Sequence, residues 1–301
     1  MADPNMATKV LDARKIEPLK HRDKTPKRVY PCAVTVCIAA ICTDREYHPI
    51  ILCSDRKLSY GDGQASSETG FKLTLAGGGW AALIAGPTSE AEMLASFFRN
   101  HLESAVLRED NYRVELNTAL GKYREWVADQ YIRKTFFTTL EKVLAAKPEN
   151  GLGKEKDRIL KEAAEIAFPE QLIVSGFIQR VPHLAVVSWE GIIENRHFAC
   201  IGSGAWLAQA ILNHREYTLG IDIDRAMYLI YEAKKFSEKE NAAGEATIIF
   251  VQETPLSSAD RSVTLRPVSR YGLLHLEEQY RRFGLQKYKR TRYRQSKPFY
   301  E

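Results

Sequence analysis

Four kinds of group that together can cleave amides occur in order between residues 35 and 86. Thr35 begins an apolar stretch, Asp55 ends the next, Lys72 lies in a third and Gly86 ends a fourth. A hydroxyl can attack an amide carbonyl, and a nearby carboxylate and ammonium help to activate it. A backbone N–H that no side chain crowds can bind the oxyanion that develops. These residue types in this order therefore predict a nucleophilic amide-cleaving site.

Four predicted strands would have to position these groups. The segments are apolar and rich in β-branched or small residues, which is typical of buried strands. The three glycines at 77–79 predict a hairpin turn, since no helix follows them directly as it would in a phosphate-binding loop. The predicted strands cover 34–42, 50–54, 71–75 and 81–85.

The rest of the chain predicts helices and further hairpins. Apolar residues at helical spacing predict one long helix over 113–146, with its aromatic stripe in core packing. The other predicted helices cover 88–104, 154–166, 205–214, a segment that Asp222 or Asp224 caps and that runs to 237, and 274–283. The other predicted strands cover 171–178, 182–189, 192–194, 198–202 and 246–252.

This order of elements predicts an α+β fold. Because the strands come in hairpins, the sheets should be mainly antiparallel, and the helices between the two runs of strands should cover the outer faces. The expected architecture is a four-layer αββα sandwich of two mainly antiparallel sheets. We expect three regions: a disordered or artefactual extension over 1–33, a domain over 34–255 with a helical insertion at about 105–168, and a basic tail over 256–301.

Positive charge is concentrated at the two ends of the chain. The net charge is +5, but residues 1–34 carry eight Lys/Arg against four Asp/Glu, and residues 256–301 carry eleven against four. The middle is therefore mildly acidic, which argues against a domain built to hold nucleic acid. The basic, tyrosine-rich segment 284–301 keeps open an alternative in which the tail contacts RNA or the acidic face of a partner.

The composition disfavours several classes of protein. No apolar run reaches the roughly 18 residues of a membrane span, and no signal-peptide core opens the chain. Five cysteines without a CxxC pair favour reduced thiols in a cytoplasmic protein, with neither disulfides nor a zinc site. The seven histidines show no metal-binding spacing, so we expect no metal and no cofactor.

An ordered set of segments over roughly residues 34–253 resembles a proteasome β-type subunit. The segments are Thr35–Ala39, Ser54-Asp55-Arg56, Phe71-Lys72-Leu73, Ile84-Ala85-Gly86, Val174-Ser175-Gly176-Phe177, His183–Glu190, Ile201-Gly202-Ser203-Gly204, Gly220–Ala233 and Ala246–Val251. That family belongs to the N-terminal-nucleophile (Ntn) hydrolases, and the chain looks most similar to its bacterial relatives of unknown substrate. The resemblance implies a proteasome-like fold, a threonine-type peptidase acting on a peptide or amide substrate, and assembly into a homo-oligomer.

The resemblance also implies a role for each site residue. Thr35 matches the nucleophile, whose freed α-amine acts as its base. Asp55 matches the carboxylate that orients Lys72, and the charge of Lys72 eases deprotonation of the hydroxyl. Gly86 matches the residue whose N–H forms the oxyanion hole, and Ser203 matches a serine near the nucleophile's amine.

Two positions depart from the family's pattern. The family's Asp-x-x-Ser after the last long helix falls on 240–243, so Glu240 keeps the charge on a longer arm and Ala243 lacks the hydroxyl. Val34 precedes Thr35 where self-cleaving relatives usually carry a small residue, and its branched side chain should hinder the strained turn of self-cleavage. The free amine could instead arise if the biological start lies at Val34 and the initiator is then removed.

Other interpretations of these residues stay open. Cys37 and Cys32 are alternative nucleophiles, although the first lacks an adjacent base and nothing after the second fits a strand start. Lys72 could point into a cleft or extend from a sheet edge, and Ser203 could be the N-cap of the following helix. The second functional hypothesis is a non-catalytic, proteasome-like structural subunit that retains its N-terminal extension.

Overall fold

The computed structural model describes residues 35–56, 58–60, 65–67, 70–238, 244–255, 262 and 264–284. The chain divides into two units at Tyr30 and Pro31, and every described residue belongs to the second unit. The extension predicted over 1–33 and most of the segment 284–301 lie outside the described residues.

The first five-stranded sheet has the order β10-β1-β2-β11-β12, and every neighbouring pair is antiparallel. In the inner strand β1, every residue of the sequence CIAAI is buried, because both faces of the strand are covered. Cys37 is paired with Ser54 on one side and with Ile201 on the other. The strands are β1 (Cys37–Ile41), β2 (Ile50–Asp55), β10 (Phe198–Ile201), β11 (Thr247–Gln252) and β12 (Leu265–Pro267).

The second five-stranded sheet is an antiparallel meander with the order β5-β6-β7-β8-β9. The predicted turn at 77–79 joins its first two strands, and all three glycines have positive φ angles. The strands are β5 (Leu73–Gly77), β6 (Trp80–Ala85), β7 (Gln171–Ile178), β8 (Val181–Ser188) and β9 (Gly191–Asn195). A separate short hairpin, β3 (Leu58–Tyr60) and β4 (Ala65–Ser67), was not predicted.

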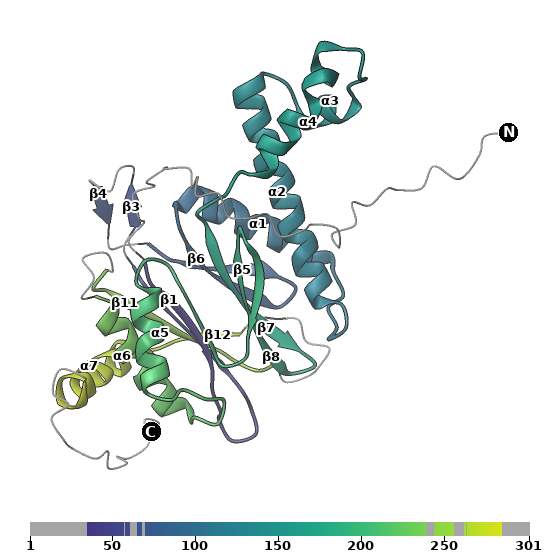
Figure 1. The fold of residues 1–301 in the computed structure, drawn as a ribbon. Helices are drawn as coiled ribbons and strands as arrows, with labels where there is room; N and C mark the ends of the chain where they lie inside the picture. Colours follow the sequence, from purple (N-terminus) through teal and green to yellow (C-terminus); the bar gives the residue numbers. More distant parts are fainter. Residues whose placement is uncertain are drawn as a thin grey trace. The chain divides into compact units, whose positions relative to one another are not determined.

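Seven helices occur in the part of the chain that the structure describes. Helices α5, α6 and α7 lie beside the first sheet, whereas α1 and α2 lie beside the second (Figure 1). The helices are α1 (Thr88–Ser104), α2 (Tyr112–Phe136), α3 (Leu140–Ala145), α4 (Gly151–Ala164), α5 (Ala205–His214), α6 (Ile223–Ser237) and α7 (Arg270–Phe283).

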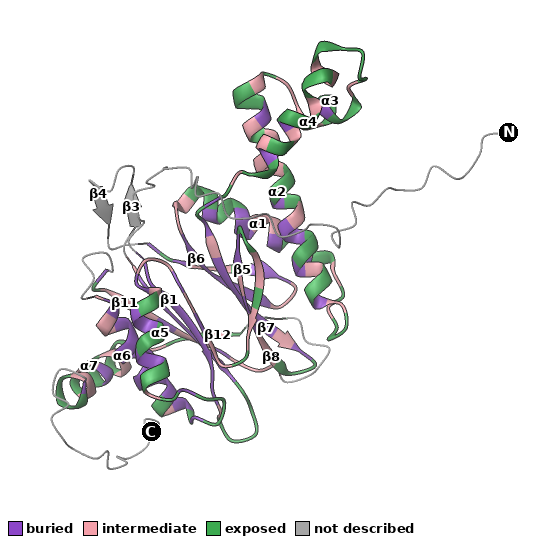
Figure 2. Ribbon diagram, in the orientation of Figure 1, coloured by how far each residue is buried: buried purple, intermediate pink, exposed green. Residues whose placement is uncertain are grey.

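The apolar core forms separate layers on the two sides of each sheet. One buried cluster joins the facing sides of the sheets, with Ala39 and Leu52 from the first and Leu83 and Ile173 from the second. A second cluster lies between the first sheet and its helices, and a third lies between the second sheet and α1 and α2. Buried residues therefore predominate in the inner strands of both sheets in Figure 2. The predicted mixed α/β class with two antiparallel sheets is confirmed, and the packing is compatible with a sandwich.

The prediction of one continuous helix over 113–146 was wrong. Phe137 has a left-handed φ of 53° at the C-cap of α2, and its side chain is 92% exposed. Thr139 then begins α3, because its hydroxyl accepts a hydrogen bond from the backbone N–H of Lys142. The end of α2 packs with α3 and α4 in a small cluster of its own. The helical stripe in the sequence therefore belongs to two helices and two separate cores.

Two further boundaries differ from the prediction. The segment 256–301, expected as a tail, contributes β12, which pairs with β11, and α7, whose Leu276 is buried against the first sheet's helices. Strand β1 begins at Cys37 and not at residue 34. The backbone carbonyl of Thr35 accepts a hydrogen bond from Gly204 and so lies outside the strand ladder.

Candidate functional site

Three of the predicted site residues meet in a closed polar cluster. Thr35 lies just before β1, Asp55 ends β2, and Lys72 lies just before β5. The ammonium Nζ of Lys72 is 2.6 Å from the Thr35 hydroxyl Oγ1 and 2.7 Å from Asp55 Oδ1. The three residues are 3%, 0% and 4% exposed. Since charges this deeply buried need partners, the pair of Asp55 and Lys72 makes the burial of both tolerable.

The carboxylate of Asp55 is held by backbone groups as well as by Lys72. Its Oδ1 also accepts from the N–H of Val36 at 3.2 Å, and its Oδ2 accepts from the N–H of Gly244 at 3.0 Å. A carboxylate with three donors from three segments of the chain cannot rotate without losing hydrogen bonds. Asp55 therefore fixes where the Lys72 ammonium can lie.

Lys72 faces inward because side chains alternate along an extended segment. Its neighbour Phe71 is exposed and lies under the guanidinium of Arg56, 5.4 Å from the ring centre. The backbone carbonyl of Lys72 accepts from the N–H of Ile84 at 2.8 Å, which ties the segment to β6. The interpretation in which Lys72 extends into solvent from a sheet edge was therefore wrong.

The turn at Gly202, Ser203 and Gly204 holds the backbone of Thr35. The Ser203 hydroxyl Oγ is 3.1 Å from the Thr35 nitrogen, from which it accepts, and 3.3 Å from the Thr35 carbonyl oxygen, to which it donates. The N–H of Gly204 donates to the same carbonyl at 3.1 Å. The N-cap of α5 is Gly204, so the expectation that Ser203 caps this helix was wrong. Ser203 instead lies against the backbone of the candidate nucleophile.

Close packing explains why a glycine occupies position 202. Its φ is +91°, and a Cβ atom there would lie 2.3 Å from the Thr35 carbonyl oxygen. Its N–H donates to Gln171 Oε1 at 3.2 Å, which ties the turn to the start of β7. The first sheet and the second sheet are thus joined beside Thr35.

Gly86 directly follows β6, and its φ is +114°. A Cβ atom there would lie 2.9 Å from the Cα atom of Glu170, so the site requires a residue without a side chain. The Cys37 thiol, at the start of β1, donates a hydrogen bond to the carbonyl of Ile84, near the end of β6, at 3.4 Å. The oxyanion role of Gly86 stays a prediction.

Glu170, which sequence reasoning missed, is a buried carboxyl beside Gly86. It is buried, and its Oε2 atom has no hydrogen-bond partner among the described residues. Burial raises the pKa of Glu170 to about 7, and the nearby Glu90 adds to this, whereas a hydrogen bond with Tyr123 opposes it. No pattern in the sequence distinguishes this glutamate, since it directly precedes an ordinary buried strand.

Several predictions fall outside the described residues. These are the position of Glu240, the missing hydroxyl at Ala243, the Val34–Thr35 junction and Cys32. Among the described residues, the last turn of α6 contacts the turn that holds Thr35. The Ser237 hydroxyl donates to the carbonyl of Gly204 at 3.1 Å.

Cys37, the other alternative nucleophile, is a buried thiol. Its Sγ donates to a backbone carbonyl, and burial raises its pKa well above the ordinary value for cysteine, although Lys72 opposes this effect. The four described cysteines are all free. A thiol that stays protonated in a closed core is a weak nucleophile.

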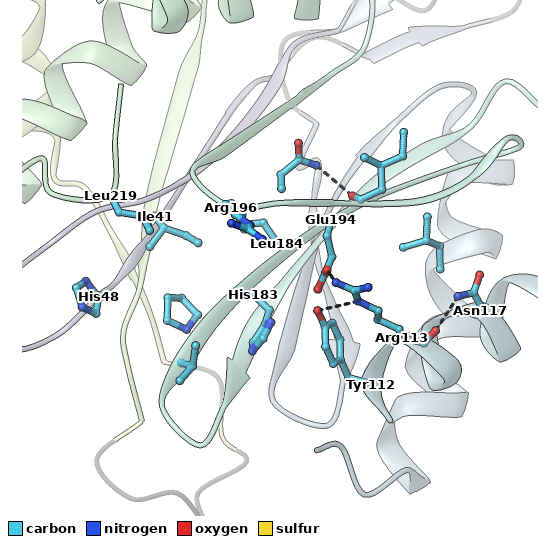
Figure 3. Close-up of a pocket in the computed structure, with 15 residues that line it drawn as sticks. Ile41, His48, Tyr112, Arg113, Asn117, His183, Leu184, Glu194, Arg196 and Leu219 are labelled. Atoms are coloured by element: carbon cyan, nitrogen blue, oxygen red, sulfur yellow. Dashed lines mark hydrogen bonds and ion pairs between the residues drawn. The ribbon is translucent and has the colours of Figure 1, made fainter. Parts of the chain in front are cut away.

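A cavity of about 820 Å³ lies away from this cluster. Figure 3 shows its lining, in which Arg113 pairs with Glu194 and the ring centre of Tyr112 lies 4.7 Å from that of His183. Ile41 lines it from the opposite end of β1 to Thr35. None of the predicted site residues lines this cavity, so it does not mark the candidate amide-cleaving site.

The described residues contain no group of three or more His, Cys, Asp or Glu side chains arranged to hold a metal ion. None of the described helices is both long enough and apolar enough to cross a membrane. A scan against known protein families found no match for the sequence, and a search of curated proteins found no relative.

Proposed function

We propose that this chain is a threonine-nucleophile hydrolase of peptide or amide bonds, with the αββα sandwich of the proteasome-like Ntn hydrolases. The observation that carries the proposal is the 2.6 Å approach of the Lys72 ammonium to the Thr35 hydroxyl, with Asp55 directly behind the lysine. A buried threonine hydroxyl needs only one ordinary partner. A buried ion pair aimed at it carries a desolvation cost that the hydroxyl alone does not require, which supports a functional role for the lysine charge.

The reaction would begin at the hydroxyl of Thr35. Its proton passes to the α-amine of the same residue while Oγ1 attacks the amide carbonyl carbon. The Lys72 ammonium favours the alkoxide character of Oγ1, and the N–H of Gly86 is proposed to bind the oxyanion. The protonated α-amine then gives its proton to the leaving nitrogen, and an ester to Thr35 remains. Water cleaves this ester, releases the carboxylic acid and restores the hydroxyl.

This mechanism requires a free α-amine on Thr35. The hydrogen bond between the Thr35 nitrogen and Ser203 would hold that amine beside the hydroxyl that it serves. The bond after Val34 must therefore be absent from the working protein. We propose either removal of the preceding residues or a biological start at Val34. Glu240 remains a proposed acid of the same site, and a cytoplasmic homo-oligomer is the proposed assembly.

The mature N-terminus tests this proposal. Intact mass measured on protein from its native host should correspond to a chain that begins at Thr35. Such protein should cleave some members of a panel of fluorogenic peptides, and Thr35→Ala should abolish this turnover whereas Thr35→Ser retains part of it. A native N-terminus at Met1, or unchanged turnover in Thr35→Ala, would contradict the proposal.

One observation favours a second candidate function. Thr35 is only 3% exposed. A substrate carbonyl cannot reach a hydroxyl in that state. A non-catalytic, proteasome-like structural subunit that retains its N-terminal extension would have this property. Such a subunit would assemble in solution with residues 1–34 attached and cleave no peptide of the panel.

A further inference from the structure

A second buried cation, Lys234, lies in helix α6, which covers the first sheet. Its side chain is 0% exposed. The ammonium hydrogen-bonds to the Glu238 carboxylate and to the backbone carbonyls of Gly244 and Glu245, each carbonyl at 2.8 Å. An ammonium has three N–H donors and no acceptor, so all of its donors are used.

The position calls for an apolar residue on packing grounds alone. Lys234 follows Ile230 and Tyr231 by one helical turn, and both of these residues are buried against the first sheet. Burial lowers the pKa of Lys234, and the Glu238 carboxylate opposes this effect. A cation in such a place is retained at a cost in solvation. Two of its three oxygen partners are backbone carbonyls beyond the end of α6, which indicates that Lys234 fixes the position of that backbone segment.

That backbone reaches the candidate site directly. The N–H of Gly244 donates to Asp55 Oδ2 at 3.0 Å, and the carbonyl of Ala246 accepts from Arg56 at 3.1 Å. Gly244 thus gives its carbonyl to Lys234 and its N–H to Asp55. Lys234 and Lys72 are therefore connected through two intermediates, Gly244 and the Asp55 carboxylate.

We infer that Lys234 is a positioning residue, an internal ammonium that fixes the Gly244 N–H on Asp55 and so holds Lys72 against the Thr35 hydroxyl. The link between Lys234 and catalysis rests on the function proposed above, whereas its hydrogen bond to the Gly244 carbonyl does not depend on that proposal. Lys234 touches no reacting atom itself. Its effect on turnover should therefore pass through the orientation of Asp55.

The neighbouring lysine offers a matched control. Lys235 pairs with the same Glu238 carboxylate at 2.6 Å, but it is 19% exposed and, among the described residues, makes no hydrogen bond to Gly244 or Glu245. Lys234→Met and Lys235→Met each remove one positive charge from Glu238. Only the first removes a donor to the two carbonyls.

The experiment follows hydrogen exchange of the Gly244 amide by NMR together with peptide turnover. Lys234→Met should speed exchange at Gly244 by about tenfold or more, the loss expected for hydrogen bonds to a charged group, while Lys235→Met leaves it unchanged. In the same variant kcat should fall by about tenfold or more with KM nearly constant, because ground-state binding does not involve Lys234. Core amides of β1 should keep their exchange rates, which separates this effect from global opening.

A second variant covers the case in which Lys234→Met fails to fold. Lys234→Ala removes a propylammonium group, so added n-propylammonium should slow exchange at Gly244 and restore part of kcat, whereas 1-propanol should do neither. Unchanged Gly244 exchange in both variants, or exchange that rises equally in β1, would overturn the inference. Altered Gly244 exchange in a protein that has no turnover with any substrate would support the hold on Gly244 and overturn only the proposed function.

Discussion

Lys72 donates a 2.6 Å hydrogen bond to the hydroxyl of Thr35, although 37 residues separate them in the sequence. The two residues directly precede strands of different sheets, since Thr35 precedes β1 and Lys72 precedes β5. The contact therefore depends on how the sheets face one another. It brings a full positive charge to a hydroxyl in a place that water hardly reaches.

Removing the lysine charge should cost both stability and turnover. Lys72→Met leaves the Asp55 carboxylate buried without its cation, which should lower the free energy of unfolding by about 3 kcal/mol. Under the proposed mechanism, turnover of a fluorogenic peptide should fall by at least about 100-fold, because the hydroxyl would lose the charge proposed to activate it. Urea denaturation and initial rates measure the two effects.

The double variant separates the charge from the packing. In Lys72→Met/Asp55→Asn both charges are gone, so it should lose less stability than the two single variants together, by about 1 kcal/mol or more. Its turnover should be at least as low as that of Lys72→Met. Strictly additive losses would contradict the buried ion pair as the reason for the stability effect.

Gly202→Ala should disrupt the support of Thr35. The added Cβ would lie 2.3 Å from the Thr35 carbonyl oxygen, and the φ of +91° disfavours alanine. We expect a loss of about 2 to 4 kcal/mol in the free energy of unfolding, and loss of turnover. Gly191→Ala is the control, since its φ is +141° and nothing lies within 4 Å of the new atom. That variant should lose only about 1 kcal/mol and keep its turnover; equal losses in the two variants would exclude the steric explanation.

The buried carboxyl of Glu170 should make stability depend on pH. Its pKa is raised from an ordinary 4.5 to about 7, mainly by burial. The folded state therefore keeps a proton that the unfolded state releases. This contribution to stability is fully present below about pH 4.5 and is lost as the pH rises to about 7, with a full size of about 3 kcal/mol.

Glu170→Gln tests this dependence. Glutamine keeps the shape of the side chain but does not titrate, so its unfolding free energy should fall less than that of the wild type between pH 5 and pH 8. Thermal or urea unfolding across this range measures the difference. Parallel pH profiles for the two proteins would show that Glu170 does not titrate in this window.

Cys37 should prove dispensable for hydrolysis. Its thiol is fully buried, and burial keeps its pKa well above the ordinary value. Cys37→Ala should keep turnover within about threefold of the wild type and lose about 1 kcal/mol of stability through the lost thiol contact. Iodoacetamide should not modify Cys37 in the folded protein. Loss of turnover in Cys37→Ala, with Thr35→Ala still active, would reverse the assignment of the nucleophile.

Strong local signals made much of the fold predictable. The predicted bounds 88–104, 171–178 and 205–214 match α1, β7 and α5, where periodicity and turn residues agree. The break after Phe136 was missed because the apolar spacing continues across it. The left-handed backbone of Phe137 ends α2, and the N-cap Thr139 then begins α3. Strand β12 was missed because three residues that pair at a sheet edge carry no pattern of their own.

The candidate site was predictable where its chemistry lies in side chains. Thr35, Asp55, Lys72 and Ser203 stand out by type and order, and the structure brings them together. The donors that fix Asp55 are backbone groups of Val36 and Gly244, which no sequence pattern reveals. The sequence shows Lys234 on the apolar face of a predicted helix, which is an unusual place for a lysine. Its role could not be predicted, because the carbonyls that it contacts lie beyond that helix.

The order of pairing in the first sheet has a consequence during translation. Strand β1 lies between β2, which follows at once, and β10, which is made much later. Ser203 follows Thr35 by 168 residues, and Gly244 follows Asp55 by 189. At about 5 to 20 residues per second, a ribosome would need roughly 10 to 40 s to supply that last donor. A nascent chain would therefore be inactive while it emerges from the ribosome. The proposed nucleophile would gain its partners only when nearly the whole domain has emerged.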